Sequence, residues 1–125
     1  MALLESGEMY LETIYVLSKK SNYVRAIDVG EQMGYTKPSV SRALSRLKND
    51  GYVTADRDGY LNLTESGLHV ASTIYERHTV LTEWLTRLGV DPQIAAQDAC
   101  RIEHVISATS FDALKRHLKY DEDAV

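Results

Sequence analysis

Residues 26–49 read AIDVGEQMGYTKPSVSRALSRLKN, and this stretch decides the fold. Its apolar pattern predicts a short helix over residues 26–33, which Gly34 ends because glycine readily adopts the left-handed conformation of a helix C-terminus. A second helix opens at Thr36, an acceptable N-cap, with Pro38 in the first turn, where its missing N–H does no harm. Two helices joined by so short a turn are typical of a helix-turn-helix.

The exposed side of the second helix has the composition of a surface that reads DNA. It carries small hydroxyls and arginines and no acid: Ser39, Ser41, Arg42, Ser45 and Arg46. Small hydroxyls let the backbone approach a groove, and arginine pairs bidentately with guanine. Thr36 and Lys37 at the helix N-terminus suit a phosphate, and Pro38 beside them is a further candidate for contact with DNA. Because no aromatic stacking platform is visible in this segment, the pattern favours double-stranded DNA over RNA.

The flanking segments complete a winged helix-turn-helix. A helix over about residues 6–19 comes first, and Asp58-Gly59 predicts a hairpin between strands at residues 52–54 and 61–63. Arg57, at the tip of this hairpin, is placed to reach a neighbouring phosphate. The fold class is therefore mainly α with a small two-stranded β wing, and residues 1–64 are predicted to form the DNA-binding domain.

Residues 65–125 are predicted to form a helical domain for metal binding and dimerisation. The expected helices cover residues 65–88, 92–107 and 110–120, with Thr64, Asp91 and Ser110 as their N-caps. We expect the tail after Tyr120 to be frayed and solvated.

The distribution of charge agrees with a DNA-binding face in the first half of the chain. The 125 residues carry a formal net charge of −4 and 26% charged residues. Residues 19–48 nevertheless hold only two anions against seven cations, which are Lys19, Lys20, Arg25, Lys37, Arg42, Arg46 and Lys48. One basic segment in an acidic chain indicates a single face for a polyanion. No stretch resembles a signal peptide or a membrane span, so we expect a cytoplasmic protein.

A second group of residues has the chemistry of a metal site. Cys100, Glu103 and His104 stand at positions i, i+3 and i+4 of a predicted helix, which puts a thiolate, a carboxylate and an imidazole on one face. Other segments can add ligands: Met9, Glu12 and His78. Each residue alone also has a structural explanation, as a small buried cysteine, a core histidine, a core methionine or a solvated acid.

The sequence resembles the DtxR/MntR family of metal-dependent repressors over nearly its whole length. The matching segments are Glu8-Met9-Tyr10-Leu11-Glu12-Thr13-Ile14-Tyr15, Lys37-Pro38-Ser39-Val40-Ser41, Leu63-Thr64-Glu65-Ser66-Gly67, Arg77-His78 and Asp98-Ala99-Cys100-Arg101-Ile102-Glu103-His104. The last segment is highly specific. The resemblance implies a homodimeric repressor that binds a palindromic DNA operator and has no enzymatic activity.

The resemblance also implies the metal ligands. Met9, Cys100, Glu103 and His104 match the ligands of the iron-responsive branch, while Glu12 and His78 match positions that the manganese-responsive branch uses. Because thioether and thiolate ligands are soft, we expect Fe²⁺ ahead of Mn²⁺, with Co²⁺, Ni²⁺ or Zn²⁺ able to bind in vitro.

Two features depart from the iron branch. Thr82 and Ala96 stand where its ancillary site is expected to have a carboxylate and a histidine. The sequence ends at Val125, and if the protein itself ends there, we expect it to lack the additional C-terminal domain of longer members and any ligand from that domain.

Two alternatives remain open at this stage. One is a metal-independent winged-helix regulator in which the face of Cys100, Glu103 and His104 is inert. The other is a small metalloenzyme or redox protein that uses Cys100, which the sequence disfavours because it shows no convincingly spaced nucleophile and base and no phosphate-binding glycine loop.

Overall fold

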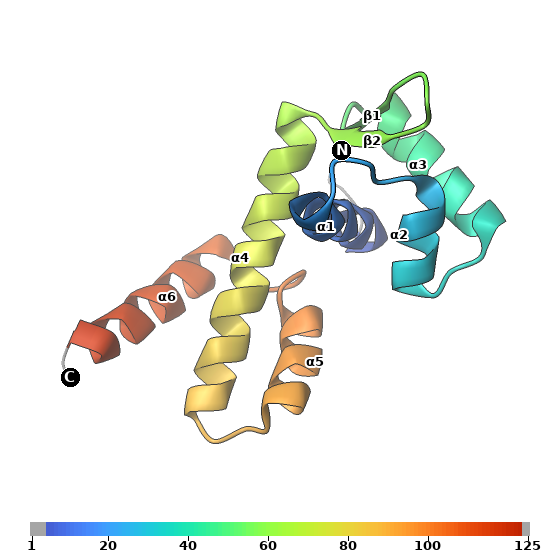
Figure 1. The fold of residues 1–125 in the computed structure, drawn as a ribbon. Helices are drawn as coiled ribbons and strands as arrows, with labels where there is room; N and C mark the ends of the chain where they lie inside the picture. The colour runs from blue at the N-terminus through green and yellow to red at the C-terminus, as the bar shows by residue number, and fades with distance from the viewer. Residues whose placement is uncertain (1–4, 124–125) are drawn as a thin grey trace. The chain divides into compact units, whose positions relative to one another are not determined.

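The computed structural model describes residues 5–123, which contain six helices and two strands (Figure 1). The helices are α1 (Glu5–Lys20), α2 (Ala26–Met33), α3 (Lys37–Asn49), α4 (Glu65–Arg87), α5 (Pro92–Ile102) and α6 (Ala108–Asp123), and the strands are β1 (Val53–Ala55) and β2 (Leu61–Leu63). The predicted fold class, mainly α with a two-stranded wing, is confirmed. The chain forms two compact units, residues 1–73 (unit 1) and residues 74–125 (unit 2), and α4 contributes to both.

The core of unit 1 joins α1, α2, α3 and the hairpin. Val40, Leu44 and Leu47 recur at i, i+4 and i+7 along α3 and are buried. They belong to one apolar cluster with Leu11 and Ile14 of α1, both fully buried. Burying one such side chain stabilises a fold by about 1.5–3 kcal/mol relative to leaving it exposed. This packing leaves the opposite side of α3 free to face solvent.

The turn between α2 and α3 depends on glycine. Gly34 has φ +72°, and its N–H donates to the Gly30 carbonyl at 2.9 Å, which ends α2 as the sequence predicts. A Cβ on Gly30 would lie 3.3 Å from Cγ2 of Val40. The two helices of the motif are therefore packed closely at this point.

The hairpin is hydrogen-bonded to the rest of unit 1 through β2 and through the residue that precedes β1. β1 and β2 pair antiparallel with Val53 opposite Leu63, and the Leu61 N–H donates to the Val24 carbonyl at 2.7 Å. The predicted first strand began one residue too early. Tyr52 lies outside the ladder because its N–H donates to Leu47 at the end of α3 and its carbonyl accepts from Thr64.

Unit 2 corrects two predictions about helix ends. α5 ends at Ile102 and not near Ser107, because the Val105 N–H donates only three residues back, to the Ile102 carbonyl at 3.0 Å, and the Ile106 N–H shares that carbonyl at 3.0 Å. The cap of α6 is Ser107 and not Ser110, since the Ser107 Oγ accepts from the Ser110 N–H at 3.1 Å. The predicted Asp91 cap of α5 is confirmed.

The last helix reaches Asp123, which is further than its predicted end at residue 120. Residues 124 and 125, which belong to the predicted frayed tail, lie outside the described residues. Within residues 5–123, no helix combines the length and the apolar character that crossing a bilayer requires.

Candidate metal centre and nucleic-acid interface

Three of the predicted metal ligands meet in unit 2. The Nδ1 atom of His78, on α4, lies 2.9 Å from Oε2 of Glu103, and Nε2 of His104 lies 3.3 Å from Oε1 of the same carboxylate. The side chains of Glu103 and His104 are fully buried, whereas that of His78 is 31% exposed. One carboxylate thus lies between two imidazoles that come from different parts of the chain.

The environment of Glu103 is what a cation would require. Its Oε1 has no hydrogen-bond partner among the described residues, and a buried carboxylate without full compensation is costly. Because an ionised carboxylate only accepts hydrogen bonds, Nδ1 of His78 would be the donor in the contact with Oε2. A carboxylate that orients an imidazole in this way is a common support of metal sites. The donors present therefore fit a divalent first-row ion.

The other predicted metal ligands occupy two helices. Cys100 is half-buried in the last turn of α5, three residues before Glu103. Met9 and Glu12 are half-buried on α1, in unit 1. Tyr10 stands between Met9 and Glu12 in the sequence, and burial, with a smaller effect of Tyr35, raises the pKa of its hydroxyl further above the physiological range. The assignment of Cys100, Met9 and Glu12 as metal ligands stays a prediction.

The expected helical triplet is altered by the early end of α5. Glu103 is the C-cap and His104 lies in the following turn, so the two are not part of a continuous helix with Cys100. The turn is held by Arg77 of α4, to which sequence reasoning gave no role. Its Nη1 donates to the carbonyls of Glu103 and Ile106. The only sequence signal for this contact was the position of Arg77 next to His78.

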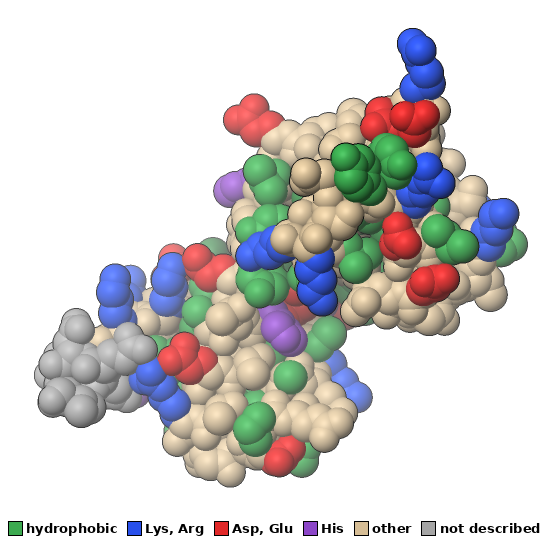
Figure 2. Space-filling model, viewed as in Figure 1, with side chains coloured by type: hydrophobic (Ala, Val, Ile, Leu, Met, Phe, Trp, Pro, Cys, Tyr) green, Lys and Arg blue, Asp and Glu red, His purple; other side chains and the backbone are tan. Residues whose placement is uncertain are grey.

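The predicted DNA-reading side of α3 is exposed. Ser41, Arg42, Ser45 and Arg46 all face solvent, and no acid stands among the helix residues Lys37–Asn49. Figure 2 shows Lys and Arg side chains, in blue, over α3 and projecting from the hairpin. Lys37 and Pro38 are exposed in the first turn, and Ser39 is half-buried there. This side of α3 is therefore accessible to a polyanion.

Three other residues predicted to bind DNA lie in segments that are held by hydrogen bonds within the protein. Thr36 caps α3, since its Oγ1 accepts from the Ser39 N–H at 3.4 Å and donates to the Ser39 Oγ at 2.9 Å. Arg25 donates to the Tyr60 hydroxyl at 3.0 Å and lies over the Tyr60 ring. Arg57 is exposed in the hairpin turn, where the Asp56 Oδ1 accepts from two backbone N–H groups. Arg25 thus braces the hairpin, a role that the sequence did not reveal.

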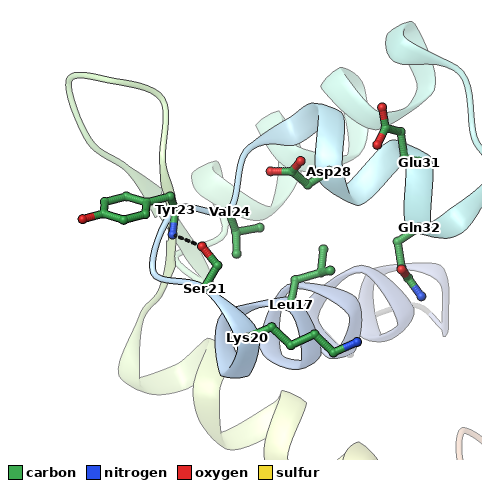
Figure 3. A pocket seen from close by; sticks show the side chains of 8 residues that line it. All are labelled: Leu17, Lys20, Ser21, Tyr23, Val24, Asp28, Glu31 and Gln32. Atoms are coloured by element: carbon green, nitrogen blue, oxygen red, sulfur yellow. Dashed lines mark hydrogen bonds between the residues drawn. The ribbon is translucent and has the colours of Figure 1, made fainter.

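Unit 1 also contains an open pocket of about 440 Å³ between the end of α1, the following loop and α2 (Figure 3). The residues that line it carry charges of both signs: Lys20 is basic, and Asp28 and Glu31 are acidic. At its edge, the Ser21 Oγ accepts a hydrogen bond from the Tyr23 N–H. None of the predicted site residues lines it. We therefore assign it no ligand.

Comparison with known protein families covers both units. Residues 2–62 match the model described as the N-terminal DNA-binding domain of iron-dependent repressors, and residues 64–123 match the metal-binding and dimerisation domain of the same repressors. These matches and the fold define a winged-helix transcriptional regulator, a protein that is not an enzyme.

Individual relatives agree with this class. The chain is 31% identical over 118 residues to the HTH-type transcriptional regulator MntR of Bacillus velezensis, covering 94% of this chain and 83% of that protein. Among solved structures, the manganese regulator SloR superposes with a TM-score of 0.81 at 27% identity, and the metal-dependent transcriptional regulator MtsR with 0.84 at 26%. Each superposition covers 91% of this chain but only 54% of the other, so the chain spans about half the length of these two proteins. The chain belongs to the DtxR/MntR family of metal-dependent transcriptional repressors.

Proposed function

We propose that this chain is a metal-activated repressor that binds DNA as a homodimer in the cytoplasm and controls genes of metal homeostasis. The observation that carries the proposal is the buried Glu103 carboxylate between the imidazoles of His78 and His104. It is supported by the acid-free exposed side of α3 in the other unit. Residues 1–64 are the proposed DNA-binding domain and residues 65–125 the proposed metal-binding and dimerisation domain.

The proposed ligands are His78, Glu103 and His104, together with Cys100 at the end of α5. Met9 and Glu12 of α1 complete the set on the strength of the sequence resemblance. An ion held by both groups of ligands would favour one arrangement of the two units. In a dimer, such a preference selects the spacing of two recognition helices, which has to match half-sites on successive turns of a palindromic operator. A coupling of about 1–3 kcal/mol changes DNA affinity roughly 5- to 150-fold.

The proposed activating ion is Mn²⁺, with Fe²⁺ as the second candidate. The similarity to SloR supports Mn²⁺, since SloR is a manganese regulator. Cys100 and Met9 support Fe²⁺, because thiolate and thioether ligands suit Fe²⁺ better than Mn²⁺, which prefers oxygen ligands. Carboxylate and imidazole ligands are compatible with both ions.

The proposed DNA contacts divide into two kinds. Arg42 and Arg46, with Ser41 beside them, are proposed to meet base edges in the major groove. The remaining predicted residues are proposed to contact the phosphate backbone and to position the helix: Arg25, Thr36, Lys37, Pro38, Ser39 and Arg57.

The decisive experiment is anaerobic retention of sheared genomic DNA on the purified chain, with Mn²⁺, with Fe²⁺ and with chelator. We expect specific fragments to be held only with metal, and the ion that acts at the lower free concentration identifies the activator. Retention of the same fragments with chelator would support a metal-independent winged-helix regulator instead. Failure to retain any fragment would refute DNA binding itself.

A matched pair of variants links this result to the centre in unit 2. Glu103→Gln removes the buried carboxylate charge and should abolish metal-dependent retention. Glu83→Gln is the control, because Glu83 is exposed on α4 and pairs only with Arg87 among the contacts described. Equal retention by both variants would exclude Glu103 from the metal response.

A further inference from the structure

Arg77 connects α4 to the segment that carries two of the proposed ligands. Its Nη1 donates to the carbonyl oxygen of Glu103 at 3.1 Å and to that of Ile106 at 2.9 Å. Its guanidinium also lies over the ring of Phe111 in α6, with Cζ 5.6 Å from the ring centroid. One side chain therefore contacts both ends of the turn between α5 and α6.

Among the contacts described, the carbonyls of Glu103 and Ile106 in this turn accept from Arg77 and from no backbone N–H. The last carbonyls of a helix have no partner within the helix, and here Val105 and Ile106 both donate to the single carbonyl of Ile102. An arginine offers several N–H donors in a rigid fork, and its charge is favourable at a helix C-terminus. Arg77 thus satisfies carbonyls that the early end of α5 leaves open.

The same residue of the turn is contacted twice by α4. Arg77 donates to the backbone of Glu103, while its neighbour His78 contacts the Glu103 side chain at 2.9 Å. Glu103 is consequently held at both its main chain and its carboxylate, and His104 follows it directly.

From this geometry we infer that Arg77 is a positioning residue for the proposed metal centre. It is not a ligand; it orders the turn so that Glu103 and His104 present their side chains to an ion before the ion binds. This inference rests on the proposed function, because it assigns Arg77 a part in metal affinity and not only in folding. Preorganised ligands bind more tightly since less ordering accompanies binding.

The test compares three variants of the full chain with the wild type. Arg77→Met removes both hydrogen bonds at similar length, and Arg77→Lys keeps the charge without the fork. Glu76→Gln is the control, because it breaks another contact between α4 and α6, the exposed ion pair of Glu76 with Lys115 at 2.9 Å. Mn²⁺ and Fe²⁺ affinities are measured anaerobically by competition with a chromophoric chelator, well below the melting temperature of each variant.

We expect Arg77→Met to weaken metal binding by about 10- to 100-fold, the usual effect of losing a residue that supports a ligand. Arg77→Lys should be intermediate, and Glu76→Gln should bind like the wild type. Folded Arg77→Met with wild-type affinity would overturn the inference, as would an equal loss in Glu76→Gln.

Amide hydrogen exchange of the metal-free chain supplies a second readout. The N–H groups of Val105 and Ile106 should exchange faster in Arg77→Met than in the wild type. In Glu76→Gln their exchange rates should equal those of the wild type. Faster exchange without a change in metal affinity would reduce Arg77 to a structural role and overturn the inference. If the wild type bound neither ion, the proposed function would be wrong. If exchange in Arg77→Met matched that of the wild type, Arg77 would not order the turn and the further inference would be wrong.

Discussion

Gly67, in the first turns of α4, shows how much can depend on one side chain. A Cβ at this position would lie 2.0 Å from the Tyr52 carbonyl oxygen, a distance that real contacts do not reach. The approach is held by Thr64, whose Oγ1 accepts from the Gly67 N–H and donates to the Gly51 carbonyl. The start of α4 is therefore seated directly on the backbone that leads into β1.

We predict that Gly67→Ala destabilises the protein although alanine favours helices. The new methyl group must push the Tyr52 backbone aside, and overpacking of this kind costs about 1–3 kcal/mol. Urea denaturation followed by far-UV circular dichroism measures the loss. Ser66→Ala, at the exposed neighbouring position, is the control and should change the midpoint little. Equal midpoints for both variants would contradict the close approach.

For the metal centre, the sequence predicted which side chains are candidate ligands better than it predicted where those side chains lie. The spacing of Cys100, Glu103 and His104 predicted donors on one helical face, and the structure instead puts Glu103 and His104 beyond the end of α5. The contact of Glu103 with His78 spans 25 residues, and that with Arg77 spans 26. Such contacts arise from tertiary packing, so helical periodicity could not have predicted them.

At the level of elements, the hairpin has a turn that is ordered by a single carboxylate. Asp56 Oδ1 accepts from the N–H groups of Asp58 and Tyr60, at 2.9 and 3.0 Å. We predict that Asp56→Ala loosens the turn that carries Arg57 and lowers DNA affinity, because an ordered phosphate contact becomes a mobile one. Fluorescence anisotropy with an operator fragment at fixed salt measures this effect.

The control for the hairpin is Asp58→Ala, which removes the same charge from the same turn but no side-chain hydrogen bond described in the structure. Both substitutions strengthen the general attraction for DNA equally, so a lower affinity of Asp56→Ala relative to Asp58→Ala isolates the loss of order. If Asp56→Ala bound at least as tightly as Asp58→Ala, order in the turn would be irrelevant to binding.

The elements that the sequence predicted best are those with local signals. Gly34 marked the end of α2, Thr36 and Pro38 marked the start of α3, and both of these helix ends lie where the three residues indicate. α5 was predicted too long because its apolar pattern continues to Ile106, whereas the helix ends at Ile102 and the residues after it contact Arg77, which is distant in sequence. The cap of α6 was misplaced because Ser107 and Ser110 are equally plausible from sequence, and the early end of α5 decides between them.

At the level of the whole molecule, metal binding and folding should be linked. A ligand that binds only the folded chain stabilises it by about 2.7 kcal/mol at a free concentration of 100 times its Kd. We predict that Mn²⁺ or Fe²⁺ raises the melting temperature of the wild type and of Glu83→Gln, but not of Glu103→Gln. Differential scanning calorimetry under anaerobic conditions checks this, and an equal rise in Glu103→Gln would place the ion elsewhere.

The acid-free side of α3 belongs to a chain whose net charge is −4, and this contrast has a consequence for the kinetics of the search for DNA. A uniformly basic protein adheres to DNA in many orientations, most of them unproductive. Here, collisions that present other, acidic parts of the chain are repelled and short-lived, whereas those that present α3 are prolonged by attraction. The charge distribution thus acts as a filter on encounter, so that residence on DNA is concentrated in the orientation able to read a sequence.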